Sequence, residues 1–187
     1  MTLRTRLISL SVVIFFGALL AAGCSSSSPG SGSGSTVTST ATTAANAAPD
    51  FNVQTIMGPT VSLSDVKSDG KPILINFGAS WCGPCNQEAP LLAQMYNKYK
   101  NRVTFLGMAV QDNPDDQRAF AKKYGLTYTI GLDNDGSVLN GYQQAGKVPY
   151  NGIPTTFFIG KKGNIVSFYV GPMTQGLFEQ QISTILK

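Results

Sequence analysis

The 187-residue chain has no histidine, only three cysteines and a low share of charged residues, 13%. Without histidine, catalytic pairs of serine or cysteine with histidine are excluded, and imidazole is lost as a metal ligand and as a proton shuttle near neutral pH. Three cysteines are too few for a zinc site of four thiolates, so we expect no metal. Any chemistry must come from cysteine, carboxylates or the backbone.

The charges of the chain are nearly balanced. The formal net charge is +4, and two of the basic residues, Arg4 and Arg6, lie in a segment that we expect to be removed. This small excess does not favour nucleic acid or an anionic surface as a partner. With 42% hydrophobic residues, the chain is long enough for one domain with a hydrophobic core.

The N-terminus has the pattern of an export signal. Two arginines precede an apolar run over residues 7–22, which is shorter than the ~20 residues that cross a bilayer comfortably. The sequence LLAAGCSSSS at its end resembles the lipobox of bacterial lipoproteins, although Ala21 stands where that pattern most often has Leu. The resemblance implies a signal peptide over residues 1–23, a lipid on Cys24 and an extracytoplasmic domain anchored to the bacterial cell membrane. An ordinary secreted protein with a spare thiol and an uncleaved anchor are the alternatives.

Residues 24–49 are rich in Ser, Gly and Thr and contain no charged or aromatic residue. Such a segment cannot bury enough apolar surface to fold. We therefore expect a flexible, lipid-anchored linker, which as a coil spans roughly 25–30 Å. A folded domain over residues 50–187 follows it.

From Asp50 onward, hydrophobic periodicity and turn residues predict strands and helices in alternation. The run over residues 71–80, rich in Ile and Leu, suits a central strand that is covered on both faces. Asn113 and Gly125 are suitable residues to begin and end a helix. In chain order we expect a hairpin (51–66), a strand (71–80), a helix (84–100), a strand (102–110), a helix (113–125), a strand (127–133), a short helix (134–144), two strands joined by a tight turn (155–160 and 164–171) and a final helix (174–187).

Two cysteines, Cys82 and Cys85, lie in the stretch NFGASWCGPCNQEAP beside the only tryptophan, Trp81. At the start of a helix, unpaired backbone N–H groups and the helix dipole favour the thiolate of the first cysteine. The spacing puts both sulfurs within disulfide range, with the first exposed and the second partly covered, and Gly83 and Pro84 suit the turn into the helix. A disulfide over so short a loop would stabilise the fold little. The pattern therefore favours a redox pair over a structural disulfide or an unused pair of thiols.

The stretch WCGPC after a buried strand, Pro90 in the helix and GIPTTFFIG far downstream are together similar to the signature of the thioredoxin superfamily. The resemblance covers about residues 50–187. It implies an α/β thioredoxin fold, a central mixed β-sheet flanked by helices, with an N-terminal β-hairpin extension and an inserted helix.

The resemblance also implies a substrate-binding surface formed by Trp81, Gly83, Pro84, Ile153 and Pro154. In that family the proline that matches Pro154 is cis and faces the disulfide, so that the backbone of Ile153 can pair with an extended substrate. A proline at a sheet edge or a bulge is the alternative for Pro154.

Within the superfamily, the chain most resembles the membrane-tethered TlpA/ResA group, which reduces disulfides outside the cytoplasm. Asn76 stands where thioredoxin has a buried Asp, and Asn cannot take a proton from Cys85. Alignment with the ResA-like proteins puts Asp112 at the position of a glutamate near their active site, which makes it a candidate proton acceptor or relay; a solvated loop acid is the alternative. We expect Glu88 to be a surface charge.

The predicted function is that of a protein-disulfide reductase in which Cys82 attacks and Cys85 resolves, with no cofactor beyond the redox-active disulfide Cys82–Cys85. Exported proteins are the expected substrates, for example in cytochrome c maturation or the recycling of methionine sulfoxide reductase. The resemblance implies a membrane thiol carrier of the CcdA/DsbD type as electron source, and we expect a monomer.

Three other functions are open: a disulfide-forming oxidant of the same fold, a thiol peroxidase, and a non-catalytic assembly or chaperone module. A further departure from the ResA-like pattern is the long stretch over residues 142–156. Its part from Lys147 to Asn151 either influences the choice of partner or is an ordinary surface loop.

Overall fold

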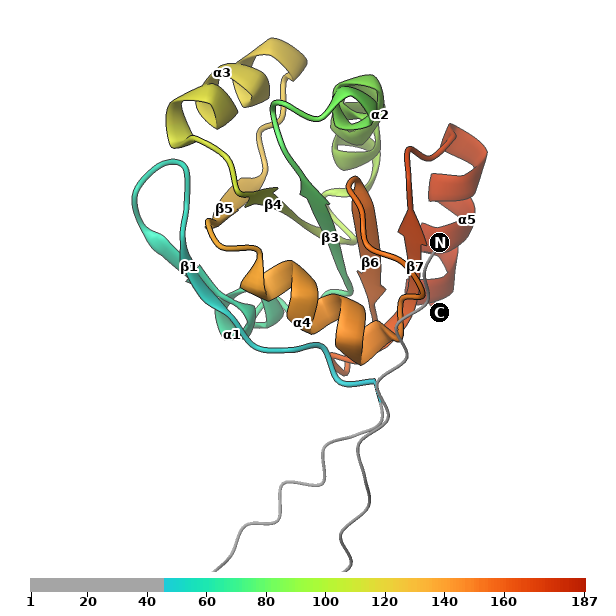
Figure 1. The fold of residues 1–187 in the computed structure, drawn as a ribbon. Coiled ribbons are helices and arrows are strands. Elements are labelled where there is room, and N and C mark those ends of the chain that lie inside the picture. Colours follow the sequence, from blue (N-terminus) through green and yellow to red (C-terminus); the bar gives the residue numbers. More distant parts are fainter. Residues whose placement is uncertain (1–45) are drawn as a thin grey trace, which may run out of the picture. The chain divides into compact units, whose positions relative to one another are not determined.

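The computed structural model describes residues 46–187, which form a mixed five-stranded sheet with helices on both faces (Figure 1). The predicted signal peptide, Cys24 and most of the predicted linker lie outside these residues. The elements in chain order are β1 (Asn52–Gln54), β2 (Thr60–Ser62), α1 (Leu63–Lys67), β3 (Ile73–Gly78), α2 (Gly83–Tyr99), β4 (Thr104–Val110), α3 (Pro114–Tyr124), β5 (Thr129–Asp133), α4 (Ser137–Gly146), β6 (Thr155–Ile159), β7 (Ile165–Val170) and α5 (Gln175–Ile185).

The strand order in the sheet is β5-β4-β3-β6-β7, so the apolar strand β3 is central, as predicted. It pairs in parallel with β4 and antiparallel with β6. The β-α-β unit and the final hairpin of β6 and β7 are also confirmed. In β3, residues from Ile73 to Phe77 alternate between the two faces, and each face is covered by helices.

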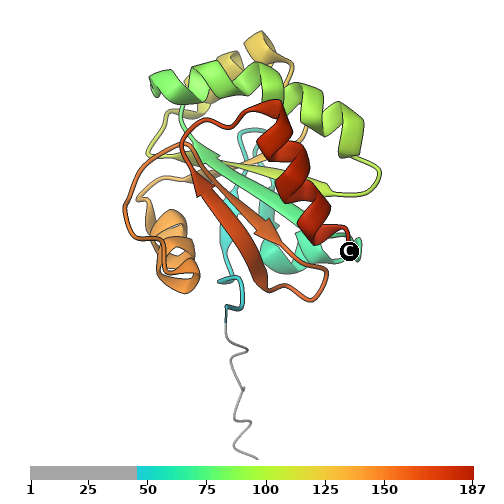
Figure 2. The same ribbon diagram turned by 90° about the vertical axis from the view of Figure 1, so that its right-hand side faces the viewer.

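Leu74 belongs to the core that includes side chains of α2, α3 and α5, and Figure 2 shows α2 and α5 across the same face. Ile73, Ile75 and Phe77 belong to the core on the opposite face, with side chains of α1, α4 and the β1–β2 hairpin. Both ends of β3 are therefore held between two packed layers, and the residues that follow Gly78 leave the sheet from a rigid strand.

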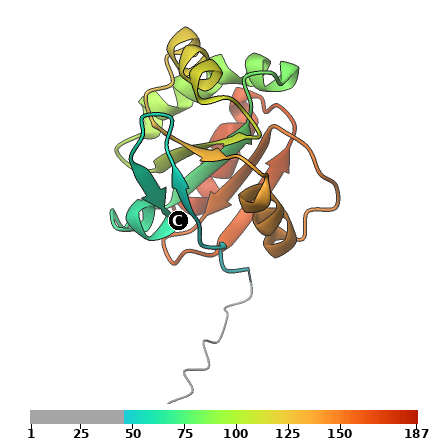
Figure 3. The same ribbon diagram turned by 60° about the vertical axis from the view of Figure 1, so that its left-hand side comes forward.

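The antiparallel hairpin of β1 and β2 lies against the edge strand β5 (Figure 3). Thr55 forms a bridge to Gly131, and the Ile56 amide donates to the carbonyl of Ile130 at 3.0 Å. Gly131 is required by this contact, because a Cβ atom there would lie 2.7 Å from Cγ2 of Val53. The hairpin thus covers part of a sheet edge that would otherwise be open.

The short helix α1 contradicts the prediction that residues 63–66 continue the second hairpin strand. Ser62 and Asp65 form a capping box, in which the Ser62 side chain accepts from the Asp65 amide and the Asp65 carboxylate accepts from the Ser62 amide. These two bonds satisfy backbone donors at the helix start. They favour a helical turn over a continued strand.

Residues 46–49, which their composition places in the linker, pair with the turn between β6 and β7. Ala47 forms a bridge to Asn164, the Ala48 amide donates to Gly163 at 2.9 Å, and the Ile165 amide donates to Asn46 at 2.8 Å. This turn is at the end of the sheet where β3 begins, because Ile73 pairs with Ile159. The described chain therefore enters the domain at the end of the sheet opposite to the point where β3 leads into α2 (Figure 1).

Candidate active site

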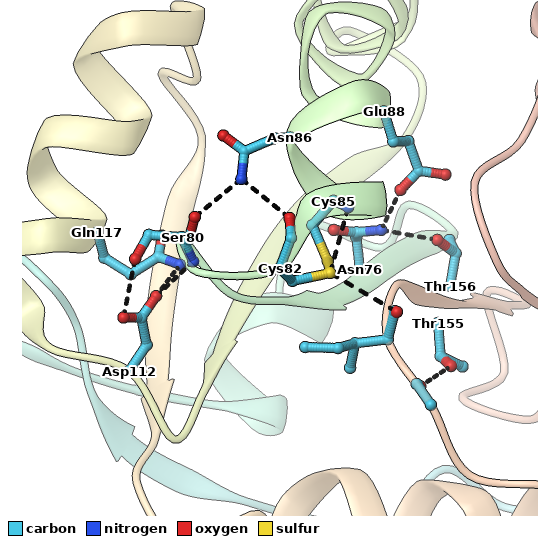
Figure 4. The surroundings of a disulfide bond; sticks show 12 residues. Asn76, Ser80, Cys82, Cys85, Asn86, Glu88, Asp112, Gln117, Thr155 and Thr156 are labelled. Carbon is cyan, nitrogen blue, oxygen red and sulfur yellow. Dashed lines mark hydrogen bonds between the residues drawn. A yellow bond between two sulfur atoms is a disulfide. The ribbon is translucent and has the colours of Figure 1, made fainter.

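Cys82 and Cys85 form a disulfide at the N-terminus of α2, with their Cα atoms 5.2 Å apart (Figure 4). Cys82 is the N-cap residue, and its Sγ accepts a hydrogen bond from the Cys85 amide at 3.2 Å. Gly83 and Pro84 are the exposed first two residues of the helix. The predicted pairing and the predicted position of the pair are both confirmed, and the amide that faces Cys82 favours a thiolate there after reduction.

Both cysteines are buried in this oxidised form, each with 5% of its surface exposed. The prediction of an exposed Cys82 is wrong, because Ala79 and Ile153 pack against the pair. The exposed residue beside it is Trp81, which is 63% exposed and donates from Nε1 to the carbonyl of Gln111 at 3.2 Å. The exposed surface beside the disulfide therefore includes the aromatic side chain of Trp81.

The Ile153–Pro154 peptide bond is cis, as predicted. The carbonyl oxygen of Ile153 lies 3.6 Å from Sγ of Cys82. Because a disulfide sulfur carries no proton, this is a close contact and not a hydrogen bond. Ile153 and the disulfide, which are far apart in the sequence, thus meet on one side of the site.

Asp112 follows β4 and holds the loop before Cys82. Its carboxylate accepts from the Ser80 amide at 2.6 Å, from the Ser80 hydroxyl at 2.9 Å and from Nε2 of Gln117 at 2.7 Å (Figure 4). Within residues 46–187 it makes no hydrogen bond to either cysteine. The predicted role in proton transfer stays a prediction, and the contacts indicate a positioning role.

Asn86 is a second positioning residue, which the sequence interpretation missed. Its Nδ2 donates to the carbonyls of Ser80 at 2.8 Å and Cys82 at 2.9 Å, and its Oδ1 accepts from the hydroxyl of Tyr124 at 2.9 Å. These bonds connect α3 with both ends of the tryptophan turn, residues 80–82. Figure 4 shows the two bonds that Asn86 donates. The only sign of this role in the sequence was that a polar residue directly follows Cys85.

Glu88 is only 2% exposed, so the prediction of a surface charge is wrong. One carboxylate oxygen accepts from the Met173 amide at 2.9 Å, and the other accepts from Nδ2 of Asn76 at 3.0 Å. Burial raises the pKa of Glu88 to about 7, and the two hydrogen bonds offset only part of that effect. Glu88 is therefore a buried acid that exchanges its proton near neutral pH.

Asn76 connects this acid with the surroundings of Cys85. Its Nδ2 also donates to the Thr156 hydroxyl at 2.9 Å (Figure 4). A Cβ atom placed on Gly78 would lie 3.5 Å from Sγ of Cys85 and 3.6 Å from Oδ1 of Asn76, so both atoms lie beside Gly78. A cavity of about 30 Å³, lined by Asn76, Cys85 and Gln117 among others, has room for one water molecule.

Two further properties concern the part of the chain that the structure describes. No group of three or more Cys, Asp or Glu side chains there is placed to hold a metal ion. No helix there is long and apolar enough to cross a membrane.

Comparison with known proteins gives consistent matches. The model of the AhpC/TSA family matches residues 44–168. The thiol-disulfide oxidoreductase ResA of Bacillus subtilis is 32% identical over 139 residues, which cover 74% of this chain and 73% of that protein.

Two solved structures have a similar fold. A thiol:disulfide interchange protein of the thioredoxin family from Chlorobium tepidum has a TM-score of 0.67 and 29% identity, covering 76% of this chain and 97% of that one. A secreted Mycobacterium tuberculosis disulfide oxidoreductase homologous to E. coli DsbE has a TM-score of 0.61 and 28% identity, covering 72% of this chain and 95% of that one. The predicted thioredoxin fold is confirmed.

Proposed function

The chain belongs to the AhpC/TSA family and is a thiol-disulfide oxidoreductase of the ResA type, and on this basis we propose that it reduces disulfides of exported proteins outside the cytoplasm. The observation that carries the proposal is the Cys82–Cys85 disulfide at the start of α2, whose first sulfur contacts the carbonyl of Ile153. The export-like N-terminus and the similarity to a secreted oxidoreductase support the location.

In the proposed reaction, the Cys82 thiolate attacks one sulfur of a substrate disulfide, and the other substrate sulfur leaves as a thiolate. Cys85 then attacks the Cys82 sulfur of the mixed disulfide and releases the second substrate thiol. Two electrons pass from the dithiol to the substrate, and the protein ends with the Cys82–Cys85 disulfide. The reaction requires no metal, flavin or nucleotide.

The position of each cysteine supports these roles. Cys82 is the N-cap residue, and the amide of Cys85 faces its sulfur, which favours the thiolate. Cys85 lies inside the first turn of α2, beside the small cavity. A substrate strand that pairs with the backbone of Ile153 would bring its own sulfur to Cys82, while Trp81, Gly83 and Pro84 offer exposed surface.

The resolving thiol must lose a proton before it attacks, and two acids are candidates to receive it. Each acid is linked to the cavity beside Cys85 by one amide side chain, Asn76 for Glu88 and Gln117 for Asp112. Glu88 is the stronger candidate because burial raises its pKa to about 7, near the working pH. If Glu88 is the acceptor, Glu88→Gln lowers the rate of the resolving step and removes its rise with pH near 7, whereas Asp112→Asn leaves that rise in place.

The partners follow from the same proposal. A lipid on Cys24 would hold the domain at the bacterial cell membrane, and a membrane thiol carrier of the CcdA/DsbD type would return two electrons after each cycle. Apocytochrome c and an exported methionine sulfoxide reductase are substrates whose thiols or disulfides fit this chemistry.

The test is a trapping experiment in cells with the full chain. Cys85→Ser is expected to accumulate a mixed disulfide with exported proteins, because nothing then resolves it, and the matched variant Cys82→Ser is expected to trap none. Absence of any adduct with Cys85→Ser, together with full activity of Cys82→Ser, would contradict the mechanism.

The direction of electron flow is tested by the reduction potential of the purified protein. A value near about −270 mV is expected for a reductase, whereas one near about −120 mV would make the protein an oxidant. Peroxide consumption tests the peroxidase alternative, which is disfavoured because Ala79 stands where the Pro-x-x-x-Thr-x-x-Cys pattern of peroxidases requires Thr. Partner binding that is undiminished in a double Cys→Ser variant would favour a chaperone-like module.

A further inference from the structure

The end of the sheet where the described chain enters the domain carries a group of lysines. Residues 46–48 pair there with the turn between β6 and β7, which contains Lys161 and Lys162. The start of β3 lies beside this turn, because Ile73 pairs with Ile159. We call the surface around the entry point the entry face. Its lysines, which are all exposed or half-buried, are Lys67, Lys71, Lys147, Lys161 and Lys162.

Contacts in the structure bring these lysines together from separate segments of the chain. The ammonium group of Lys67 lies against the β6–β7 turn, since a Cβ atom on Gly163 would be 2.8 Å from its Nζ. Lys71 lies two residues before β3. Lys147 lines a hollow together with Asn46 and the first residues of β7. The positive charges therefore surround the point where the chain enters.

Little negative charge balances these lysines. The acidic residues in these segments or next to them in the sequence are Asp50, Asp65 and Asp69. Asp69 lies 4.0 Å from Lys71, and the other lysines of the entry face take part in none of the ion pairs formed among residues 46–187. Arg102 is not counted with them, because it shares a hollow with Glu179. An excess of positive charge thus remains on the entry face.

The opposite end of the sheet, beside the disulfide, is acidic. Strands β4 and β5 end there, because they run parallel to β3. The acidic residues at or after their ends are Asp112, Asp115, Asp116, Asp133 and Asp135. The basic residue that follows in α3, Arg118, pairs with Asp115. The small net charge of the chain, which gave no reason to expect an anionic partner, is therefore the sum of a basic end and an acidic end.

Helix dipoles account for only part of this separation. The acids at the start of α3 and Lys67 in the last turn of α1 complement the dipoles of their helices. Lys161 and Lys162 lie in a turn between two strands, where no helix dipole acts on them. Because they form no ion pair among residues 46–187, their charges are available to a surface outside the domain.

The attachment of the chain indicates which surface this is. If Cys24 carries a lipid, the expected linker between it and Asn46 spans roughly 25–30 Å as a coil and joins the domain at the entry face. Anionic phospholipid headgroups attract basic groups within a Debye length, about 8–10 Å. Each lysine near such a surface strengthens the contact about fivefold. The lysines of the entry face therefore lie at the attached end of the domain, where this attraction can act on them.

We propose that the entry face rests on the anionic phospholipid headgroups of the membrane to which the protein is anchored. The lysines supply the attraction, and the acidic end with the disulfide faces away from the bilayer. The inference goes beyond the proposed function because it involves no redox step, and it rests on the proposed anchoring.

The first test measures how fast lysines are acetylated in the full-length protein on vesicles. Vesicles of phosphatidylcholine alone are compared with vesicles that also contain phosphatidylglycerol. The surface potential of an anionic leaflet concentrates protons about three- to sevenfold, and only the neutral amine reacts, so a lysine at the headgroups should react more slowly by that factor. Mass spectrometry should show this for Lys67, Lys161 and Lys162, and high salt should abolish it.

Lys122 is the internal control of this experiment. It is exposed on α3, and Figure 1 shows α3 on the side of the domain opposite to the entry point. Its acetylation rate should be the same on both kinds of vesicle. Equal rates for Lys67, Lys161 and Lys162 on both kinds of vesicle would overturn the proposal. Equal slowing of Lys122 would also overturn it, because the contact would then not be made by the entry face.

Paired variants show whether the lysines of the turn cause the protection. Lys161→Gln/Lys162→Gln should weaken the contact about thirtyfold, so that Lys67 is acetylated equally fast on both kinds of vesicle. The matched variant Lys122→Gln/Lys123→Gln removes two charges from α3 and should leave Lys67 protected. Protection of Lys67 that survives the loss of both turn lysines would overturn the assignment. The salt series on the wild type tests the proposal even if a variant fails to fold.

Activity and anchoring are measured on the same samples. Reduction of a soluble disulfide peptide should be unchanged in Lys161→Gln/Lys162→Gln, because the turn and the disulfide are at opposite ends of β3. Lysine protection without reduction would refute only the proposed function, and reduction without lysine protection would refute only this inference. Release of the protein from both kinds of vesicle at high salt would refute the anchoring, whereas protection at low salt would still support the contact. Protection by a DNA duplex but not by anionic vesicles would assign the face to another polyanion and overturn the proposal.

Discussion

Replacing Glu88 by Gln should remove most of the pH dependence of the protein's stability between about pH 4.5 and 7. Burial raises the pKa of Glu88 to about 7, whereas in the unfolded chain it titrates near its ordinary value of 4.5. Between these two values the folded protein holds a proton that the unfolded chain has lost. Each pH unit in that interval lowers the free energy of unfolding by about 1.4 kcal/mol.

The contribution of Glu88 to the free energy of unfolding should therefore be largest below about pH 4.5. It should fall by about 3 kcal/mol as the pH rises through 7. Few other groups can obscure the effect. The chain has no histidine, and in the oxidised protein Cys82 and Cys85 do not titrate.

The assay is urea unfolding of the oxidised protein, followed by far-ultraviolet circular dichroism at a series of pH values. Glu179→Gln is the matched control, because Glu179 is the only other glutamate and Lys98 lowers its pKa out of the interval. The wild type and Glu179→Gln should show the decline, and Glu88→Gln should not. A flat wild-type profile, or the same decline in Glu88→Gln, would refute the burial argument.

Three further predictions concern other contacts of the fold and the site. Gly131→Ala should lower the free energy of unfolding by about 1–3 kcal/mol, because its Cβ would lie 2.7 Å from a side chain of β1. Gly176→Ala is the control, since a Cβ there meets free space, and it should leave the urea midpoint unchanged. Asp112→Asn should lower stability by about 1–3 kcal/mol, because both carboxylate oxygens of Asp112 accept hydrogen bonds and the amide of Asn keeps only one oxygen; an unchanged urea midpoint would contradict the positioning role. Asn86→Leu should speed amide hydrogen exchange in the tryptophan turn, because the carbonyl of Ser80 loses its donor, and unchanged exchange would contradict this.

The fold could be predicted where local pattern and packing agree. The continuous apolar run of β3 specified a strand buried on both faces, and Phe178, Ile182 and Ile185 specified the buried face of α5. Helix α1 was missed because five residues carry too little periodicity, and its signal is the short capping box of Ser62.

The site could be predicted in its sulfur chemistry but not in its burial. The spacing of Cys82 and Cys85 is a local property, so their pairing was predictable. The burial of Glu88 depends on Met173, which is 85 residues further along the chain, and that of Cys82 depends on Ile153. Contacts between residues so far apart in the sequence cannot be predicted from local periodicity, because they form only when the strands assemble.

The entry of the chain at the β6–β7 turn has a consequence for how a tethered domain would meet its partners. That turn and the disulfide are at opposite ends of β3, a strand of six residues, which is about 20 Å long. If Cys24 carries a lipid, the attachment itself would not hold the disulfide against the bilayer, because the point where the described chain enters the domain and the disulfide are at opposite ends of the sheet.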